Sequence, residues 1–111
     1  MKLSKDYSTY LKGEFYKCLC LFEEQNEGLT AFISTFSYEV YGLQYKNVNL
    51  TTLDTITNIL EHFYDDSLAS DYNINTIRRE CFHCISLVDK LLKAGAHGWI
   101  TEIFTLKDMA I

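Results

Sequence analysis

Apolar residues recur along most of this chain at steps of three and four, the spacing that places side chains on one face of an α-helix. The pattern is clearest over residues 74–92. The apolar positions of that segment are Ile74, Ile77, Cys81, Cys84, Ile85, Val88, Leu91 and Leu92. Lysines occupy its last turn and Gly95 follows, as is typical of a helix C-terminus. The sequence therefore predicts a long amphipathic helix that is capped by Asn73 or Asn75 and ends before Gly95.

Three earlier segments show the same helical period. Their apolar faces predict helices from about Lys5 to Glu24, from Leu29 to Tyr41, and from an N-cap at Thr51 or Thr52 to Phe63. Gly42 is expected to end the second helix in the left-handed conformation that glycine adopts readily. The acidic stretch from Asp65 to Asp71 is expected to form the loop before the long helix.

Length and composition suit a single helical domain. The 111 residues contain no proline, and 48% of them are hydrophobic, which is enough to bury a core without metals or disulfides. The stretch from Ala96 to Ala110 keeps a helical period and predicts a short fifth helix. The expected fold is therefore all-α: a compact antiparallel bundle of four amphipathic helices plus a short C-terminal helix, spanning residues 1–111 as one domain.

Charge and hydropathy disfavour several functional classes. A formal net charge of -5 opposes binding to nucleic-acid backbones, so nucleic acid is not an expected partner. No run approaches the roughly 18 apolar residues of a membrane-spanning helix, and residues 1–6 lack the apolar core of a signal peptide. We therefore expect a cytoplasmic protein without membrane contacts, in a compartment that keeps its four cysteines reduced.

Cysteine spacing allows one candidate metal site. Cys81 and Cys84 are three residues apart, so both thiolates can reach one ion, with Cys18 of another helix as a third ligand. All three nevertheless occupy positions on the predicted apolar faces of their helices. Buried free cysteine packs like a small hydrophobic side chain. We therefore favour a core role for these residues and expect no metal and no cofactor. Cys20 projects to the polar side of its helix, where its thiol should be accessible.

One short motif resembles a known active site. Arg78, four intervening residues and His83 resemble the arginine-x4-to-6-histidine motif of HEPN domains, small helical bundles that often act as metal-independent ribonucleases. The resemblance covers six residues. It implies that Arg78 would hold the scissile phosphate while His83 would help activate the 2'-hydroxyl or protonate the leaving oxygen, commonly across a dimer interface. The alternative is an exposed polar face on which Arg79 and His83 are neighbours.

Acidic and aromatic residues indicate a protein interface. The acidic candidates form two stretches, with Glu23, Glu24 and Glu27 in the first and Asp65, Asp66 and Asp71 in the second. Exposed aromatic side chains are typical of protein interfaces. The aromatic candidates are Tyr16, Tyr38, Tyr45 and Tyr72, outside the apolar stripes or in loops, and Phe104 beside Trp99 in the C-terminal segment.

These observations favour a non-enzymatic, cytosolic protein-binding module over an enzyme. Its expected partner is a protein with a basic surface, and self-association through an aromatic or tail surface belongs to the same hypothesis. Such a chain would suit an immunity, anti-defence or regulatory factor of a bacterium, phage or other mobile element. Two alternatives are a HEPN-like ribonuclease or toxin that uses Arg78 and His83, and a DNA-binding regulator. The connection before the long helix is too long for a helix-turn-helix.

Overall fold

Four α-helices and one 3-10 helix account for most of the chain that the structure describes. A computed structural model describes the backbone of residues 5–105 and the side chains of residues 5–91. The helices are α1 (Lys5–Glu24), α2 (Leu29–Tyr41), η1 (Gly42–Tyr45, the 3-10 helix), α3 (Leu50–Ala69) and α4 (Ile74–Thr105). Within residues 5–105 there is no strand. The predicted bounds of the first two helices are confirmed.

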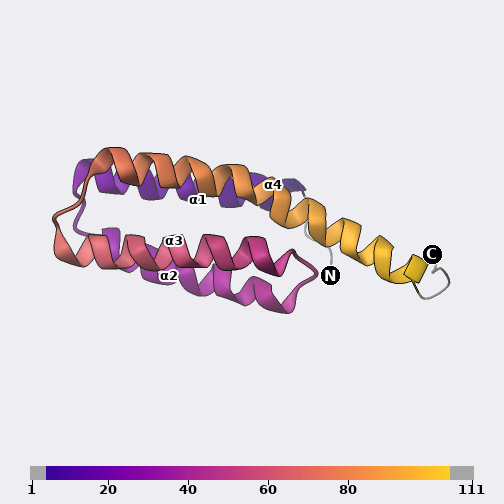
Figure 1. The fold of residues 1–111 in the computed structure, drawn as a ribbon. Coiled ribbons are helices and arrows are strands. Elements are labelled where there is room, and N and C mark those ends of the chain that lie inside the picture. The colour runs from indigo at the N-terminus through magenta and orange to yellow at the C-terminus, as the bar shows by residue number, and fades with distance from the viewer. Residues whose placement is uncertain (1–4, 106–111) are drawn as a thin grey trace.

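The helices form an antiparallel bundle. α1 packs beside α4, and α2 packs beside α3, so the bundle consists of two layers of two helices (Figure 1). The turns from α1 to α2 and from α3 to α4 lie at one end, and the connection from α2 through η1 to α3 lies at the other (Figure 1). Short connections favour this arrangement because they oblige consecutive helices to lie side by side and run in opposite directions. The prediction of an all-α bundle of four antiparallel helices is confirmed.

The core consists of the apolar helix faces that the helical period of the sequence predicted. Phenylalanines from three helices meet edge to face inside it: the ring centroids of Phe15 and Phe36 are 5.0 Å apart, and those of Phe22 and Phe63 are 5.4 Å apart. α4 adds smaller side chains to the same core, namely Ile77, Cys81, Cys84, Val88 and Leu91. Among the described side chains, no buried nitrogen or oxygen atom lacks a hydrogen-bond partner. The interior is therefore stabilised mainly by apolar packing, and its few buried polar groups are hydrogen-bonded.

The connection from α2 to α3 differs at both of its ends from the sequence-based expectation. Gly42 has a right-handed φ of -62°, and its N–H donates to carbonyls of α2, so the chain tightens into η1 where a left-handed stop was expected. The N-cap of α3 is Asn49, and the expectation of a cap at Thr51 or Thr52 is wrong. The Asn49 side-chain oxygen accepts a hydrogen bond from the N–H of Thr52 at 3.0 Å, which satisfies one of the unpaired donors of the first turn.

The end of α3 lies later than predicted. The helix continues to Ala69, and Ser70 then takes a left-handed φ of 58° that ends it. Asp65 and Asp66 therefore lie on α3, and the expectation of an acidic loop starting at Asp65 is wrong. The cap of α4 is as predicted, because the Asn73 side-chain oxygen accepts from the backbone N–H groups of the second and third helical residues.

The last helix passes its predicted end. α4 continues through Gly95 to Thr105, so the expected stop at Gly95 is not found. The side chains of residues 92–105 and all of residues 106–111 lie outside the described part. The short C-terminal helix over residues 96–110 therefore stays a prediction. None of the helices, within the described residues, is long and apolar enough to cross a membrane.

Replacement of Phe63 by alanine should destabilise the bundle strongly. The side chain is fully buried and packs on Phe22, so its loss leaves a cavity between α1 and α3. We expect Phe63→Ala to lower the free energy of unfolding by about 3–5 kcal/mol in a urea titration. The matched control is Tyr38→Ala, because Tyr38 is 81% exposed and its truncation should change stability by less than about 0.5 kcal/mol. Equal effects of the two variants would contradict the described core.

Candidate functional site

The three cysteines considered as metal ligands lie in the core. Cys18, Cys81 and Cys84 are each 0% exposed, and the Cys81 thiol donates a hydrogen bond to the Phe15 carbonyl at 2.9 Å. Burial raises the pKa of Cys18 and Cys84, and it raises the pKa of Cys81 to about 12. All three therefore stay protonated at neutral pH, whereas a metal ligand must be a thiolate. Among the described residues, no three His, Cys, Asp or Glu side chains are placed to hold a metal ion.

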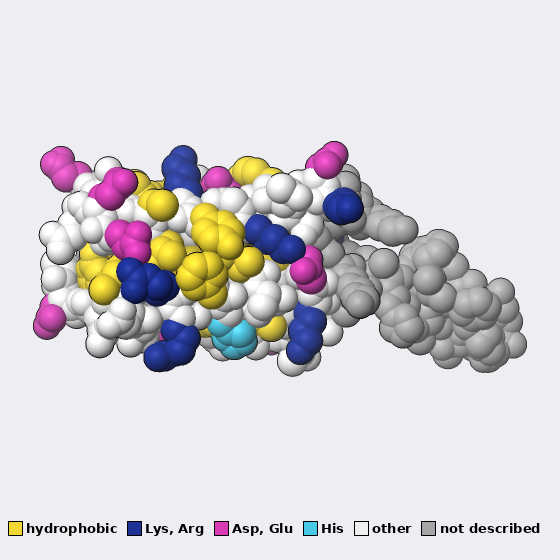
Figure 2. Space-filling view, turned by 90° about the horizontal axis from the view of Figure 1, so that it is seen from above, with side chains coloured by type: hydrophobic (Ala, Val, Ile, Leu, Met, Phe, Trp, Pro, Cys, Tyr) yellow, Lys and Arg dark blue, Asp and Glu magenta, His cyan; other side chains and the backbone are white. Residues whose placement is uncertain are grey.

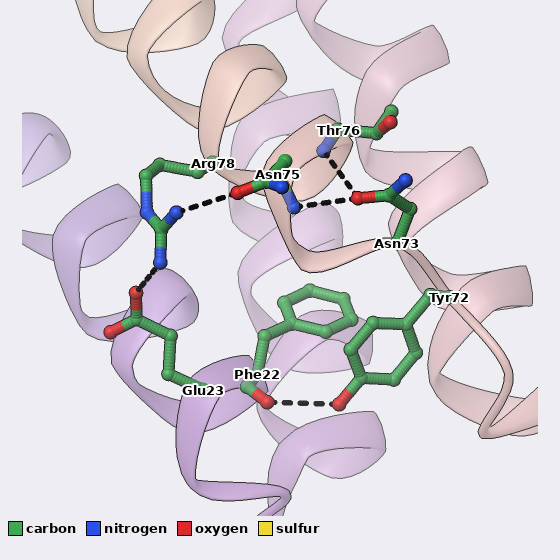
Figure 3. A network of polar contacts seen from close by, with 7 residues as sticks. All are labelled: Phe22, Glu23, Tyr72, Asn73, Asn75, Thr76 and Arg78. Atoms are coloured by element: carbon green, nitrogen blue, oxygen red, sulfur yellow. Dashed lines mark hydrogen bonds and ion pairs between the residues drawn. The ribbon is translucent and has the colours of Figure 1, made fainter.

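Arg78 is engaged in a network at the start of α4 (Figure 3). Its Nη2 donates to Glu23 Oε2 of α1 at 2.6 Å, and its Nη1 donates to Asn75 Oδ1 at 3.0 Å. The carboxylate of Glu23 thus compensates the charge that a HEPN-like site would direct at a phosphate. The guanidinium instead ties the first turn of α4 to the last turn of α1.

His83 does not join Arg78 within one chain. α4 is a continuous helix through both residues, and five helical steps turn a side chain by about 140°. His83 is exposed, and its backbone carbonyl accepts a hydrogen bond from the Ser86 hydroxyl one turn later. The arrangement that the HEPN resemblance implies is therefore not assembled by a single chain, and a composite site would require a second one.

Two turns bring most of the acidic candidates to one end of the bundle. Glu24 is the last residue of α1, Glu27 lies in the turn from α1 to α2, and Asp71 lies in the turn from α3 to α4. All three are exposed. A hollow of about 360 Å³ lies between these turns. Its lining is mostly polar and includes Asn26, Glu27, Thr30, Ser67, Ser70 and Tyr72.

Tyr72 lies in the turn between α3 and α4 and is fastened there to the end of α1. Its hydroxyl donates to the Phe22 carbonyl at 2.8 Å, and its ring packs edge to face on the Phe22 ring at 5.0 Å between centroids (Figure 3). The side chain is half-buried and fastens the turn between α3 and α4 to the end of α1. Tyr72 therefore stabilises the contact between the α3–α4 turn and α1 more than it contributes to an exposed surface.

A second hollow of about 520 Å³ runs along the outer side of α2 and α3. Three tyrosines and two carboxylates line it together with two serines: Tyr38, Tyr41, Tyr64, Glu61, Asp65, Ser34 and Ser37. The Tyr41 hydroxyl donates to the Glu61 carboxylate across the two helices, which fixes the position of one ring. We call this feature the tyrosine groove. Its aromatic walls and exposed carboxylates suit a cationic side chain, because cations bind both carboxylates and the faces of aromatic rings.

Sequence reasoning found only part of the tyrosine groove. Tyr38 and Asp65 were among the predicted interface residues, whereas Tyr41, Glu61 and Tyr64 were not. Their spacing carried a signal, since positions 34, 37, 38 and 41 and positions 61, 64 and 65 follow the helical period on polar faces. That period does not reveal which two polar faces become neighbours.

Asp66, the neighbour of the groove residue Asp65, lies in a less exposed environment than Asp65. Asp66 is half-buried, and its pKa is raised by burial and by the negative charge of Glu80 on α4. A carboxylate in this position is less available to a partner than Asp65, which is exposed. Of the two acids, Asp65 is therefore the better candidate for intermolecular contacts.

Charge is divided unequally between the two layers. Residues 29–69, which include α2 and α3, contain five carboxylates and one lysine, a formal net charge of -4 with histidine neutral. Residues 5–24 and 74–91, which form α1 and the described side chains of α4, contain six carboxylates and six cations and are neutral. The tyrosine groove therefore lies on the layer that attracts basic molecules.

Comparisons with family models, with curated proteins and with solved structures found no match for this chain. Two of the predicted contact residues, Trp99 and Phe104, lie where side chains are not described. Tyr16 is exposed on the other layer, beside Phe82.

Cys20 should be the single reactive thiol of the folded chain. It is exposed, whereas the three other cysteines are buried and their pKa values are raised. We expect a thiol reagent such as DTNB to modify one cysteine per chain at pH 8 and all four in denaturant. The matched control is Cys20→Ser, which should remove the native reaction entirely. Rapid modification of more than one thiol in the folded protein would contradict the described packing of α4 on α1.

Proposed function

We propose that this chain is a non-enzymatic protein-binding module that presents the tyrosine groove and the neighbouring acidic residues to a basic protein partner. One observation carries the proposal: three tyrosines and two carboxylates line a hollow on the layer whose formal net charge is -4. Glu24, Glu27 and Asp71 add exposed carboxylates at one end of the bundle.

The chemistry of the groove supports protein recognition. Tyrosine is enriched at protein interfaces because its ring contributes a large contact area while its hydroxyl still forms hydrogen bonds. Tyr38 projects furthest, with 81% of its surface exposed. Lysine and arginine side chains of a partner would lie against the rings and pair with Glu61 and Asp65. Acidic residues around the contact would accelerate association with a basic surface.

The biological setting belongs to the same proposal. A short acidic protein that covers a basic surface would act as a regulatory, immunity or anti-defence factor of a bacterium, phage or other mobile element. A cytoplasmic location accompanies this role. Charge complementarity supports this role, because a surface that binds nucleic acid or an acidic substrate is basic and can be blocked by carboxylates.

Substitutions in the tyrosine groove should abolish partner binding without unfolding the chain. We expect Tyr38→Ala and Asp65→Lys each to reduce the amount of the captured partner at least about tenfold in quantitative affinity purification from the native host. The control is Tyr45→Ala, because Tyr45 is equally exposed but lies on η1 outside the groove. Retained binding by both groove variants, with unchanged melting temperatures, would contradict the proposal.

The non-enzymatic assignment has its own test. Because Glu23 pairs with Arg78 and the helix separates Arg78 from His83, the purified chain should not cleave RNA in the presence of a chelator. The measurement is a cleavage assay on the wild type and on His83→Ala. Cleavage by the wild type that disappears in His83→Ala at an unchanged melting temperature would show an enzyme and overturn the assignment.

A further inference from the structure

The outer face of α1 and α4 carries an exposed aromatic pair at its centre. Tyr16 of α1 and Phe82 of α4 meet edge to face with ring centroids 5.7 Å apart, yet they remain 48% and 45% exposed. Cys20, one turn along α1 from Tyr16, is exposed beside them. Figure 2 looks onto this side of the bundle and shows hydrophobic side chains gathered between charged ones. Exposed aromatic pairs of this kind are typical of the centres of protein interfaces.

Two ion pairs flank the aromatic pair along the seam between α1 and α4. On one side, Lys12 of α1 binds Asp89 of α4, with 2.9 Å between Nζ and Oδ1. On the other side, Glu23 of α1 binds Arg78 of α4. α1 therefore carries a cation before Tyr16 and a carboxylate after it, and the antiparallel α4 carries the complementary charges. The four charges form a rectangle in which signs alternate at the corners.

This alternation makes the face complementary to itself. A two-fold axis in the plane of the face, along the seam, sets Lys12 opposite the partner's Asp89. A two-fold axis across the seam sets Lys12 opposite the partner's Glu23. In both cases each of the four charges meets the opposite sign, and the aromatic pairs of the two copies meet at the centre. Self-complementarity about a two-fold axis is what an isologous dimer requires.

We propose that the α1–α4 face binds a second copy of this chain, with Tyr16 and Phe82 at the centre of the contact. The charge balance of the layers supports this occupant, because the α1–α4 layer is neutral whereas the α2–α3 layer would repel its own copy. The inference goes beyond the proposed function and does not depend on it. It leaves the tyrosine grooves of both copies on the outside.

The oligomeric state of the purified chain tests this proposal. Multi-angle light scattering and sedimentation equilibrium should give a dimer at micromolar concentrations. Phe82→Glu should raise the dimer dissociation constant at least about tenfold, because it places a carboxylate in the centre of the contact of each copy. The matched control is Tyr45→Glu, an equally drastic change at an exposed position on η1, which should leave the dimer intact. Circular dichroism melting checks that both variants fold.

Charge reversals give a second and independent readout. Lys12→Glu should weaken the dimer, because in either orientation the new carboxylate faces a carboxylate of the partner. Reversal of all four charges restores complementarity and should restore the dimer. The restoring variant combines Lys12→Glu, Glu23→Lys, Arg78→Glu and Asp89→Lys. A chain that stays monomeric up to about millimolar concentration, or a dimer that is insensitive to both Phe82→Glu and Lys12→Glu, would overturn the proposal.

Discussion

The edge-to-face packing of phenylalanines from α1, α2 and α3 is the contact on which the rest of this molecule depends. Phe15 meets Phe36, and Phe22 meets Phe63, so α1 is fixed against both helices of the other layer. α4 completes the core with cysteine, valine, isoleucine and leucine, and its Cys81 thiol reaches the Phe15 carbonyl of α1. Because the described interior holds no charged side chain, recognition is left to the outer faces of the two layers.

The two layers differ in what they present. The α2–α3 layer combines a strong negative charge with a groove lined by tyrosines, which suits a basic protein. The α1–α4 layer is neutral and has two ion pairs on either side of an exposed aromatic pair, which suits a second copy. An exposed ion pair contributes little to stability on its own. We therefore expect Lys12–Asp89 and Glu23–Arg78 to contribute more to recognition of a second copy, through their alternating charges, than to the stability of the fold.

Hydrophobic periodicity predicted the fold class and the bounds of the first two helices because each stripe must be buried against the others. Boundaries set by single hydrogen bonds were harder to predict. Asn49 caps α3 in place of a threonine, and α3 runs past the acidic residues to Ser70 because helical packing overrides the loop preference of aspartate. The tyrosine groove was found only in part, since its walls come from two helices whose relative rotation no single-helix pattern determines. The contact of Tyr72 with Phe22 was not predicted either, because the two residues are fifty positions apart in the chain.

If the two layers bind different molecules, photo-crosslinking in the native host should give a different product from each layer. A photoreactive aromatic residue is introduced in place of Tyr38 or in place of Phe82, and the covalent products are identified by mass spectrometry. We expect position 38 to yield an adduct with another protein that is rich in lysine and arginine at the crosslinked site, and position 82 to yield the crosslinked homodimer. The same product from both positions, or a homodimer formed only through position 38, would contradict this expectation.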